Sequence, residues 1–220
     1  VMVLRAIPNG DEYDKDVARA IRYAVDNGAK IINGSFGKYF SSNPEWVIDA
    51  IRYASKKDVL VVAAAGNESK DLDLLSNDNY PNDQFFNKNE FSDTFIKVGA
   101  STINLNENFT AYFSNYGKIN VDIFAPGVDI YSSVPNDKYK FQDGTSMASP
   151  VVSGIASLIM SYFPKLSAKK VKEIILKSGI DIDLKIGNLG SNKHFREYSK
   201  SGKLINAYNA LILASKSKRE

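Results

Sequence analysis

The stretch "VLVVAAAGN", from Val59 to Asn67, carries the strongest structural signal in this chain of 220 residues. Its short apolar run is closed by Gly66 and Asn67, which is typical of a buried strand followed by a turn. A similar run, "AKIINGSFG", predicts another buried strand from Lys30 to Phe36. Strands that are apolar on both faces are typical of parallel sheets covered by helices on both sides.

Between these two runs the sequence predicts a helix that begins at Asn43, with Pro44 in its first position. Val47, Ile51 and Ala54 then fall on one face of that helix. A strand, a helix and a second strand in this order form a right-handed crossover between parallel strands.

The same alternation continues in both directions. A first strand is predicted from Met2 to Ile7, followed by a helix that ends at Gly28 and carries Val17, Ile21, Ala24 and Val25 on one face. The remaining predicted elements are short strands at "TFIKVGAS", "FTAYFS" and "VDIFAPG", and helices over Ser146 to Phe163, from Ser167 to Gly179, and near "INAYNALILAS". We therefore expect one α/β domain over residues 1–220, a three-layer αβα architecture with a mostly parallel central sheet.

Composition excludes several classes of function. The net charge is only +3, and no basic cluster is interleaved with aromatic residues, so nucleic-acid binding has no electrostatic support. No apolar run approaches the ~18 residues of a membrane span. The absence of cysteine excludes thiol catalysis and disulfides.

A polar loop gives way to a long apolar segment at Ser146, within "FQDGTSMASPVVSG". A serine in this position commonly caps a helix. It could also be a nucleophile, because the free N–H groups and the dipole of a helix N-terminus stabilise nearby negative charge. The surrounding groups must decide between the two roles.

Asn67 is the first such group, because it ends a predicted strand at the carboxyl edge of the sheet, where parallel sheets bind ligands. Its amide and the backbone N–H of Ser146 would together form an oxyanion hole. Without Ser146, the simpler interpretation of Asn67 is a turn residue.

A serine nucleophile needs a base, and the single histidine is His194. The order Ser146, then Asp181 or Asp183, then His194 would match the α/β-hydrolases. However, the Gly-x-Ser-x-Gly elbow of those enzymes is absent, since Ala148 takes the place of its last glycine. We expect His194 to be an exposed loop residue, and an esterase that uses it remains a disfavoured alternative.

Three stretches together resemble the subtilisin-like serine proteases, or subtilases: "IINGSFG", "VLVVAAAGNES" and "DGTSMASPVVSG". "FAPGVDIYSS" and "SGKLINAYNAL" extend the resemblance over nearly the whole chain. The Gly-Thr-Ser-Met-Ala-Ser-Pro string is highly specific, and the strings occur in the family's order. The resemblance implies a subtilisin-like fold and a serine endopeptidase that cuts polypeptides through an acyl-enzyme.

The resemblance also assigns roles to individual residues. Ser146 would be the nucleophile, and Asn67 would hold the oxyanion together with the Ser146 N–H. A cis bond is expected between Tyr80 and Pro81. The implied substrate-binding residues are Ser35, Phe36 and Gly37, which would pair with the substrate backbone, and Ala64, Ala65, Gly66 and Asn79, which would line the pocket for the side chain before the scissile bond.

One departure from the family is large. Subtilases order their triad Asp, His, Ser, with the first two in Asp-Ser/Thr-Gly and His-Gly-Thr-His strings, and neither string is found here. "MVLRAI" matches the strand that follows the family's histidine helix, so the chain resembles the C-terminal portion of a catalytic domain, with the N-terminal part absent. We expect that part to be a required partner and the chain alone to be inactive. The alternative is a non-catalytic binding or structural module.

The sequence gives little indication of a metal site or of the cellular compartment. The acidic run "DLDLLSND" fits no defined calcium loop, and one histidine among scattered acids gives no metal-ligand spacing. We expect no required cofactor and no metal site, although calcium often stabilises this family. The resemblance further implies a secreted or cell-envelope location and allows a propeptide as an additional partner.

Overall fold

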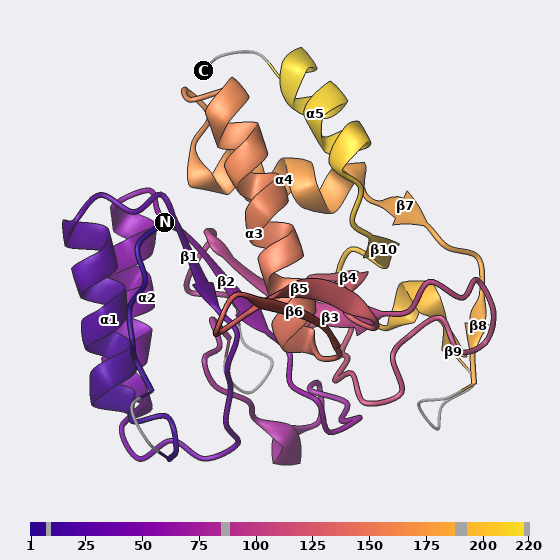
Figure 1. Ribbon diagram of the computed structural model, residues 1–220, viewed down its shortest axis with the longest axis horizontal. Coiled ribbons are helices and arrows are strands. Elements are labelled where there is room, and N and C mark those ends of the chain that lie inside the picture. The colour runs from indigo at the N-terminus through magenta and orange to yellow at the C-terminus, as the bar shows by residue number, and fades with distance from the viewer. Residues whose placement is uncertain (8–9, 85–88, 188–192, 218–220) are drawn as a thin grey trace.

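A six-stranded sheet forms the centre of the computed structural model, which describes residues 1–7, 10–84, 89–187 and 193–217 (Figure 1). The strand order is β1, β2, β3, β4, β10, β7, and every neighbouring pair is parallel except β10 with β7. The strands are β1 (Ile31–Gly34), β2 (Leu60–Ala64), β3 (Phe95–Ser101), β4 (Ile123–Pro126), β7 (Ile180–Asp181) and β10 (Lys203–Leu204). This sheet confirms the predicted α/β class.

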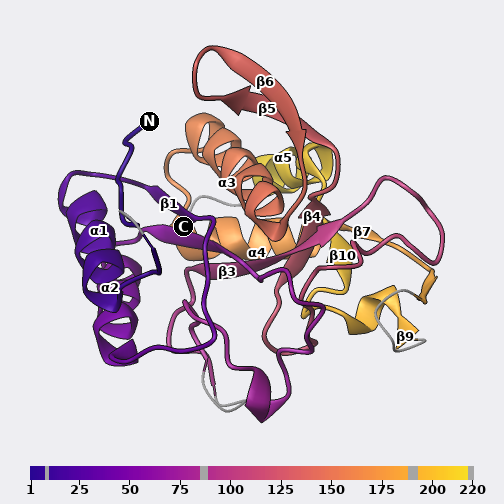
Figure 2. The ribbon, with the colours of Figure 1, turned by 60° about the horizontal axis from the view of Figure 1, so that its bottom comes forward.

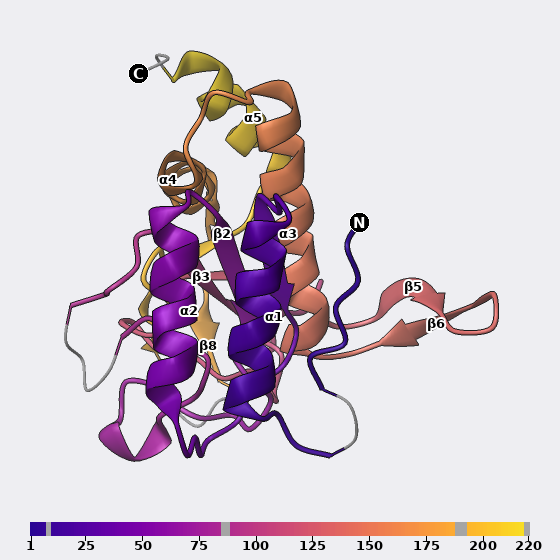
Figure 3. The same cartoon turned by 90° about the vertical axis from the view of Figure 1, so that its left-hand side faces the viewer.

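Helices cover both faces of the sheet. On one face, α1 (Asp14–Asp26) and α2 (Pro44–Lys56) bury an apolar cluster with Val61, Ala63 and Phe95, and Figure 3 shows these two helices side by side. On the other face, a second cluster packs against Val62, Ile96 and Val98. The helices on that second face are α3 (Thr145–Tyr162), α4 (Ala168–Ser178) and α5 (Ala207–Lys216). The three-layer architecture is therefore as predicted.

Local sequence signals explain where these helices begin and end. Asn43 precedes α2, with Pro44 in its first position, and the Ser167 hydroxyl accepts a hydrogen bond from the Lys170 N–H at the start of α4. Gly28, just after α1, has a φ of +83°, a conformation that favours glycine.

The strand predicted from Met2 to Ile7 is wrong, because this segment forms no strand. Met2, Leu4 and Ala6 instead line one side of an apolar groove of about 760 Å³ whose other side includes β1. A strand needs a hydrogen-bonding neighbour, and this segment has none in the described sheet. In the sheet of described residues, β1 is consequently an edge strand, with one side of its backbone unpaired there.

A second predicted strand, "FTAYFS", is also wrong. Phe109 and Ala111 are buried, but the only ladder contact of this segment among the described residues is a single bridge between Thr110 and Ser101. The segment turns back at Ser114, whose N–H bonds to the Ala111 carbonyl. The apolar residues of this segment are buried without forming a strand, so their pattern alone led to the wrong prediction.

A hairpin formed by β5 (Ile130–Val134) and β6 (Lys138–Gln142) was not predicted and projects away from the body of the molecule (Figures 2 and 3). Its exposed aromatic rings, Tyr131, Tyr139 and Phe141, pack on one another. The smaller described elements are β8 (Lys185–Ile186), which pairs with β9 (Lys193–His194), and two 3-10 turns, η1 (Leu75–Asn77) and η2 (Phe195–Glu197).

Candidate active site

Ser146 is the second residue of α3 and lies against the segment that follows β1. Its Oγ donates a hydrogen bond of 3.0 Å to the Ser35 carbonyl, and the Ser35 Oγ donates one of 2.8 Å to the Ser146 carbonyl. Deeper in the same contact, Asn33 Oδ1 accepts bonds from Ser149 and Ser153. The small residues of α3 thus let the helix approach the carboxyl end of β1 closely.

Asn67 lies on the other side of the α3 N-terminus, beyond the end of β2. Its Oδ1 accepts two bonds of 2.9 Å, one from the Thr145 N–H and one from the Thr145 Oγ1. Because the amide oxygen is fixed in this way, the Nδ2 donor faces the start of α3, 3.6 Å from the position of a Cβ on Gly144. An N–H donor and a helix N-terminus therefore meet beside Ser146, and the oxyanion role of Asn67 stays a prediction.

Thr145 holds the Asn67 side chain in place, and sequence reasoning missed it. It is fully buried, and its Oγ1 also accepts a bond of 3.0 Å from the Gly66 N–H. One hydroxyl thus joins the turn after β2 to the start of α3. Its position between Gly144 and Ser146 was an available signal, but its hydrogen-bond partners lie 78 and 79 residues away in the sequence.

The other predicted substrate-binding residues fall into two groups. In the first, the backbone of Lys38 pairs with that of Tyr80, and the Asn79 amide lies 3.4 Å from the Cβ position of Gly37. The expected cis bond between Tyr80 and Pro81 is present. In the second, at the end of β2, Ala64 and Ala65 are buried and Gly66 has a φ of +100°.

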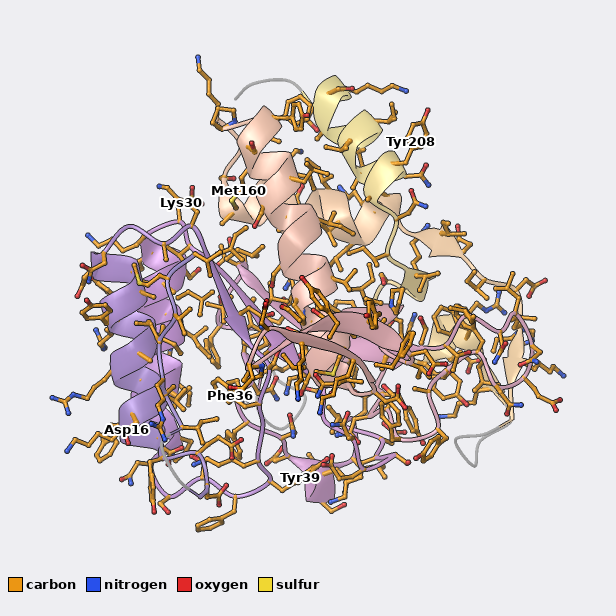
Figure 4. The ribbon with its side chains drawn as sticks, in the orientation of Figure 1. Asp16, Lys30, Phe36, Tyr39, Met160 and Tyr208 are labelled. Carbon is orange, nitrogen blue, oxygen red and sulfur yellow. The ribbon has the colours of Figure 1, made fainter. Side chains whose placement is uncertain are left out.

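Phe36 lies differently from its neighbours Ser35 and Gly37. Its side chain packs with the cluster under α1 and α2 and lines the apolar groove (Figure 4). Any contact of Phe36 with a substrate would thus be made by its backbone.

A polar cluster that was not predicted joins the segment after β1 to the segment after β2. Tyr39 donates a hydrogen bond to the Glu68 carboxylate, and Asn115 Nδ2 donates to Tyr39, Glu68 and the Ala65 carbonyl. Burial raises the pKa of Tyr39, and the bond to Glu68 raises it further, so the phenol stays protonated. The Lys70 ammonium lies 3.8 Å from the centre of the Tyr39 ring.

His194 does not belong to this site. It lies on β9, on the side of the molecule away from β1 (Figures 1 and 2), where its Nδ1 is 3.6 Å from Asp183 Oδ1. Because Ser146 bonds to Ser35 instead, the arrangement gives no support to an esterase that uses His194, Asp181 or Asp183. The prediction that His194 is an exposed loop residue is wrong, since it lies on β9 and is partly buried.

The groove beside β1 runs close to this site. Lys30 and Met160 lie toward one end and Phe36 toward the other (Figure 4). Asn33 and Ser153, which tie β1 to α3, also line it.

Comparison with known proteins identifies the family of this chain. A family model described as "Subtilase family" matches residues 1–201. The chain belongs to the subtilase family. It is 37% identical over 198 residues to the cell wall-associated protease of Bacillus subtilis, and 35% identical over 213 residues to the thermophilic serine proteinase of Bacillus sp. strain AK1.

These matches cover 90% and 96% of this subtilase chain but only 20% and 45% of the two relatives. Among solved structures, the prenylagaramide maturation protease PagA has a TM-score of 0.73 and 28% identity, covering 94% of this chain and 70% of that one. The self-cleaved protease domain of PatA has a TM-score of 0.70 and 26% identity, with coverages of 94% and 70%. The chain spans less than half the length of the two Bacillus relatives.

Two further observations concern ligands and membranes. Within the part of the subtilase chain that the structure describes, no three His, Cys, Asp or Glu side chains gather as metal ligands. Asp73 of the acidic run instead accepts hydrogen bonds from the backbone of Ile119 and Asn120. No helix in the described ranges is long and apolar enough to cross a membrane.

Proposed function

We propose that this chain is the portion of a serine endopeptidase that contributes the nucleophile, the oxyanion hole and the substrate cleft. The observation that carries the proposal is the joint placement of Ser146 and Asn67 around the N-terminus of α3, fixed by Thr145. Family membership supports a polypeptide substrate. The reaction requires no cofactor on this account.

In the proposed reaction, the Ser146 Oγ attacks the scissile carbonyl carbon while a base takes its proton. The carbonyl oxygen becomes an oxyanion that accepts hydrogen bonds from Asn67 Nδ2 and the Ser146 N–H. The tetrahedral intermediate then expels the amine, which leaves with the proton from the base. Water hydrolyses the acyl-serine by the same steps in reverse and restores Ser146.

The base and the acid that orients it come from residues outside these 220, because His194 is the single histidine of the sequence and lies elsewhere. The groove beside β1 supports a base and an acid that come from another segment, because an added strand could pair with the open side of β1. In a parallel sheet, such a strand would end on the side of the sheet where β1 leads to Ser35 and Ser146.

The test is hydrolysis of a peptide p-nitroanilide by the full-length protein, by its Ser146→Ala and His194→Ala variants, and by the 220-residue chain alone. We expect the full-length protein and His194→Ala to be active, and Ser146→Ala and the isolated chain to lack normal activity. A missing base leaves only a residual acceleration of roughly 10³–10⁴ over water. Cleavage by the chain alone that His194→Ala abolishes would instead establish the esterase-like alternative.

The non-catalytic alternative predicts a different result from the same measurement. A binding module would leave the full-length protein inactive while still binding a peptide in the cleft. Intact Ser146 and Asn67 favour catalysis over this reading.

We propose a secreted or cell-envelope location by analogy with the cell wall-associated relative. Another relative, 37% identical over 167 residues, is the major intracellular serine protease of Bacillus subtilis. Fractionation of the producing cell decides between these compartments.

A further inference from the structure

Asn115 is a fully buried asparagine between β3 and β4 that bonds to the turn carrying Asn67. Its backbone N–H donates a hydrogen bond of 3.0 Å to the Gly66 carbonyl, and its Oδ1 accepts one of 3.2 Å from the Glu68 N–H. The peptide groups on the two sides of Asn67 are therefore both bonded to this one residue. Nothing in the reaction proposed above uses Asn115.

The side-chain amide of Asn115 extends this contact along the turn. Its Oδ1 also accepts a bond of 2.8 Å from the Lys70 N–H, and its Nδ2 donates one of 2.8 Å to the Ala65 carbonyl. Two backbone N–H groups require the amide oxygen on one side, and a carbonyl requires the amide nitrogen on the other. A carboxylate could not donate to Ala65, and an apolar side chain could make none of these bonds.

The Asn115 amide also lies directly against the backbone that precedes Asn67. A Cβ on Gly66 would lie 2.4 Å from Asn115 Nδ2, which is closer than atoms can pack, and Gly66 has a φ of +100°. Nδ2 further contacts Tyr39 Oη at 2.6 Å and Glu68 Oε2 at 3.0 Å. The amide is thus enclosed by the turn and by the polar cluster described above.

Thr145 holds the same turn from the side of α3. Its Oγ1 accepts a bond from the Gly66 N–H, so Gly66 bonds to Thr145 through its nitrogen and to Asn115 through its oxygen. Thr145 fixes the side chain of Asn67, whereas Asn115 fixes the backbone on which that side chain stands. A hydrogen-bond donor that is held in advance stabilises developing charge most effectively.

We infer that Asn115 is a positioning residue for catalysis, which holds the backbone on both sides of Asn67 so that the Asn67 amide reaches the oxyanion. This inference rests on the proposed function, in which Asn67 Nδ2 donates to the oxyanion. Asn115 touches no reacting atom in that reaction and acts only through Asn67.

A double-mutant cycle on the full-length protein tests this role. Hydrolysis of a peptide p-nitroanilide is compared for the parent, Asn115→Leu, Asn67→Ala and the variant that carries both changes. Leucine is close to asparagine in size but makes none of its side-chain hydrogen bonds. Because a misplacement of about 1 Å can lower a rate by ~10²-fold, we expect Asn115→Leu to lower kcat by roughly 10–10² and to leave KM little changed.

The second background separates positioning from a general structural role. In Asn67→Ala the oxyanion donor is already absent, so Asn115→Leu should cause little further loss of kcat there. A residue that only stabilises the fold would lower kcat by the same factor with or without Asn67.

Asn120→Leu is the matched control, because it makes the same change at another buried asparagine. The Asn120 Nδ2 donates to the Leu72 carbonyl at 3.0 Å and to Asp73 Oδ1 at 3.1 Å, beyond the turn that carries Asn67. Both leucine variants should lower the free energy of unfolding in urea, but only Asn115→Leu should lower kcat.

If Asn115→Leu fails to fold, Asn115→Ser takes its place in the cycle. Its shorter side chain leaves room for water, which can satisfy the freed backbone groups without fixing them in position. The same loss of kcat is expected in the parent background, and little further loss in Asn67→Ala.

The outcomes separate the two proposals. An Asn67→Ala variant that keeps the full kcat would overturn the oxyanion role of Asn67 and this inference with it. If Asn67→Ala loses activity but a folded Asn115 variant keeps the parent kcat, or loses the same factor in both backgrounds, the inference alone is overturned.

Discussion

Thr145 joins Asn67, the proposed oxyanion donor, to the start of α3 through its buried hydroxyl and its backbone N–H. Asn67 is therefore held by Thr145 at its oxygen, and its nitrogen donates no hydrogen bond to the described residues. Such preorganisation matters because the donor need not reorient when charge develops on the substrate oxygen.

Asn67→Ala should lower kcat by roughly 10²–10³ and leave KM little changed, because the lost hydrogen bond is made mainly in the transition state. Steady-state kinetics of the full-length protein check this, with Asn33→Ala as a control residue that bonds to α3 without facing the oxyanion. A rise in KM at constant kcat for Asn67→Ala would show that Asn67 binds substrate and not the oxyanion.

At the scale of elements, Asp14 joins the beginnings of the two helices that cover one face of the sheet. It is the first residue of α1, and its carboxylate accepts bonds from Ser41 Oγ and from the backbone N–H of Asn43, which precedes α2. Lys38 Nζ completes the group at 2.8 Å. Burial works against the charge, but these hydrogen bonds outweigh it and lower the pKa of Asp14.

A lowered pKa in the folded state means that Asp14 stabilises the fold above its unfolded pKa, and that this contribution is lost as pH falls through the folded value. Asp14→Asn should reduce the free energy of unfolding by about 2 kcal/mol at pH 7. The difference from the parent should shrink in acid. Urea unfolding of the full-length protein between pH 3 and 8, in a Ser146→Ala background that prevents self-cleavage, measures both. A difference that grows in acid would show that the charged carboxylate of Asp14 does not stabilise the fold.

Elements with strong periodicity and caps were predictable, whereas those that depend on a distant partner were not. α1, α2 and α4 follow from their apolar faces and from Gly28, Pro44 and Ser167. Met2 to Ile7 has the composition of a strand, but strand formation also needs a neighbour, which composition cannot report. The hairpin of β5 and β6 was not predicted, because its alternating aromatic rings point to solvent and to one another.

The residues of the candidate site also divide into those that the sequence predicted and those that it did not. Ser146, Asn67 and Asn79 were nominated by short strings that resemble a known family. Thr145 and Tyr39 were not, because their contacts depend on partners brought together by folding.

For the whole molecule, the open edge of β1 and the groove beside it dominate behaviour in isolation. Val1, which lines this groove, and Val3 are exposed, and an unpaired strand edge is a template for association. We expect the 220-residue chain alone to self-associate or to require the rest of its domain for solubility. Sedimentation velocity combined with thermal unfolding checks this, and a monomer that unfolds cooperatively would contradict it.

The most direct test of the central claim is mass-spectrometric mapping of a peptidyl diphenyl phosphonate adduct on the full-length protein. Such a reagent modifies an activated serine and leaves inert hydroxyls unmodified. The account predicts a single adduct on Ser146 that is absent from Ser146→Ala, unaffected by His194→Ala, and not formed by the 220-residue chain alone. An adduct on another residue, or none on the full-length protein, would contradict it.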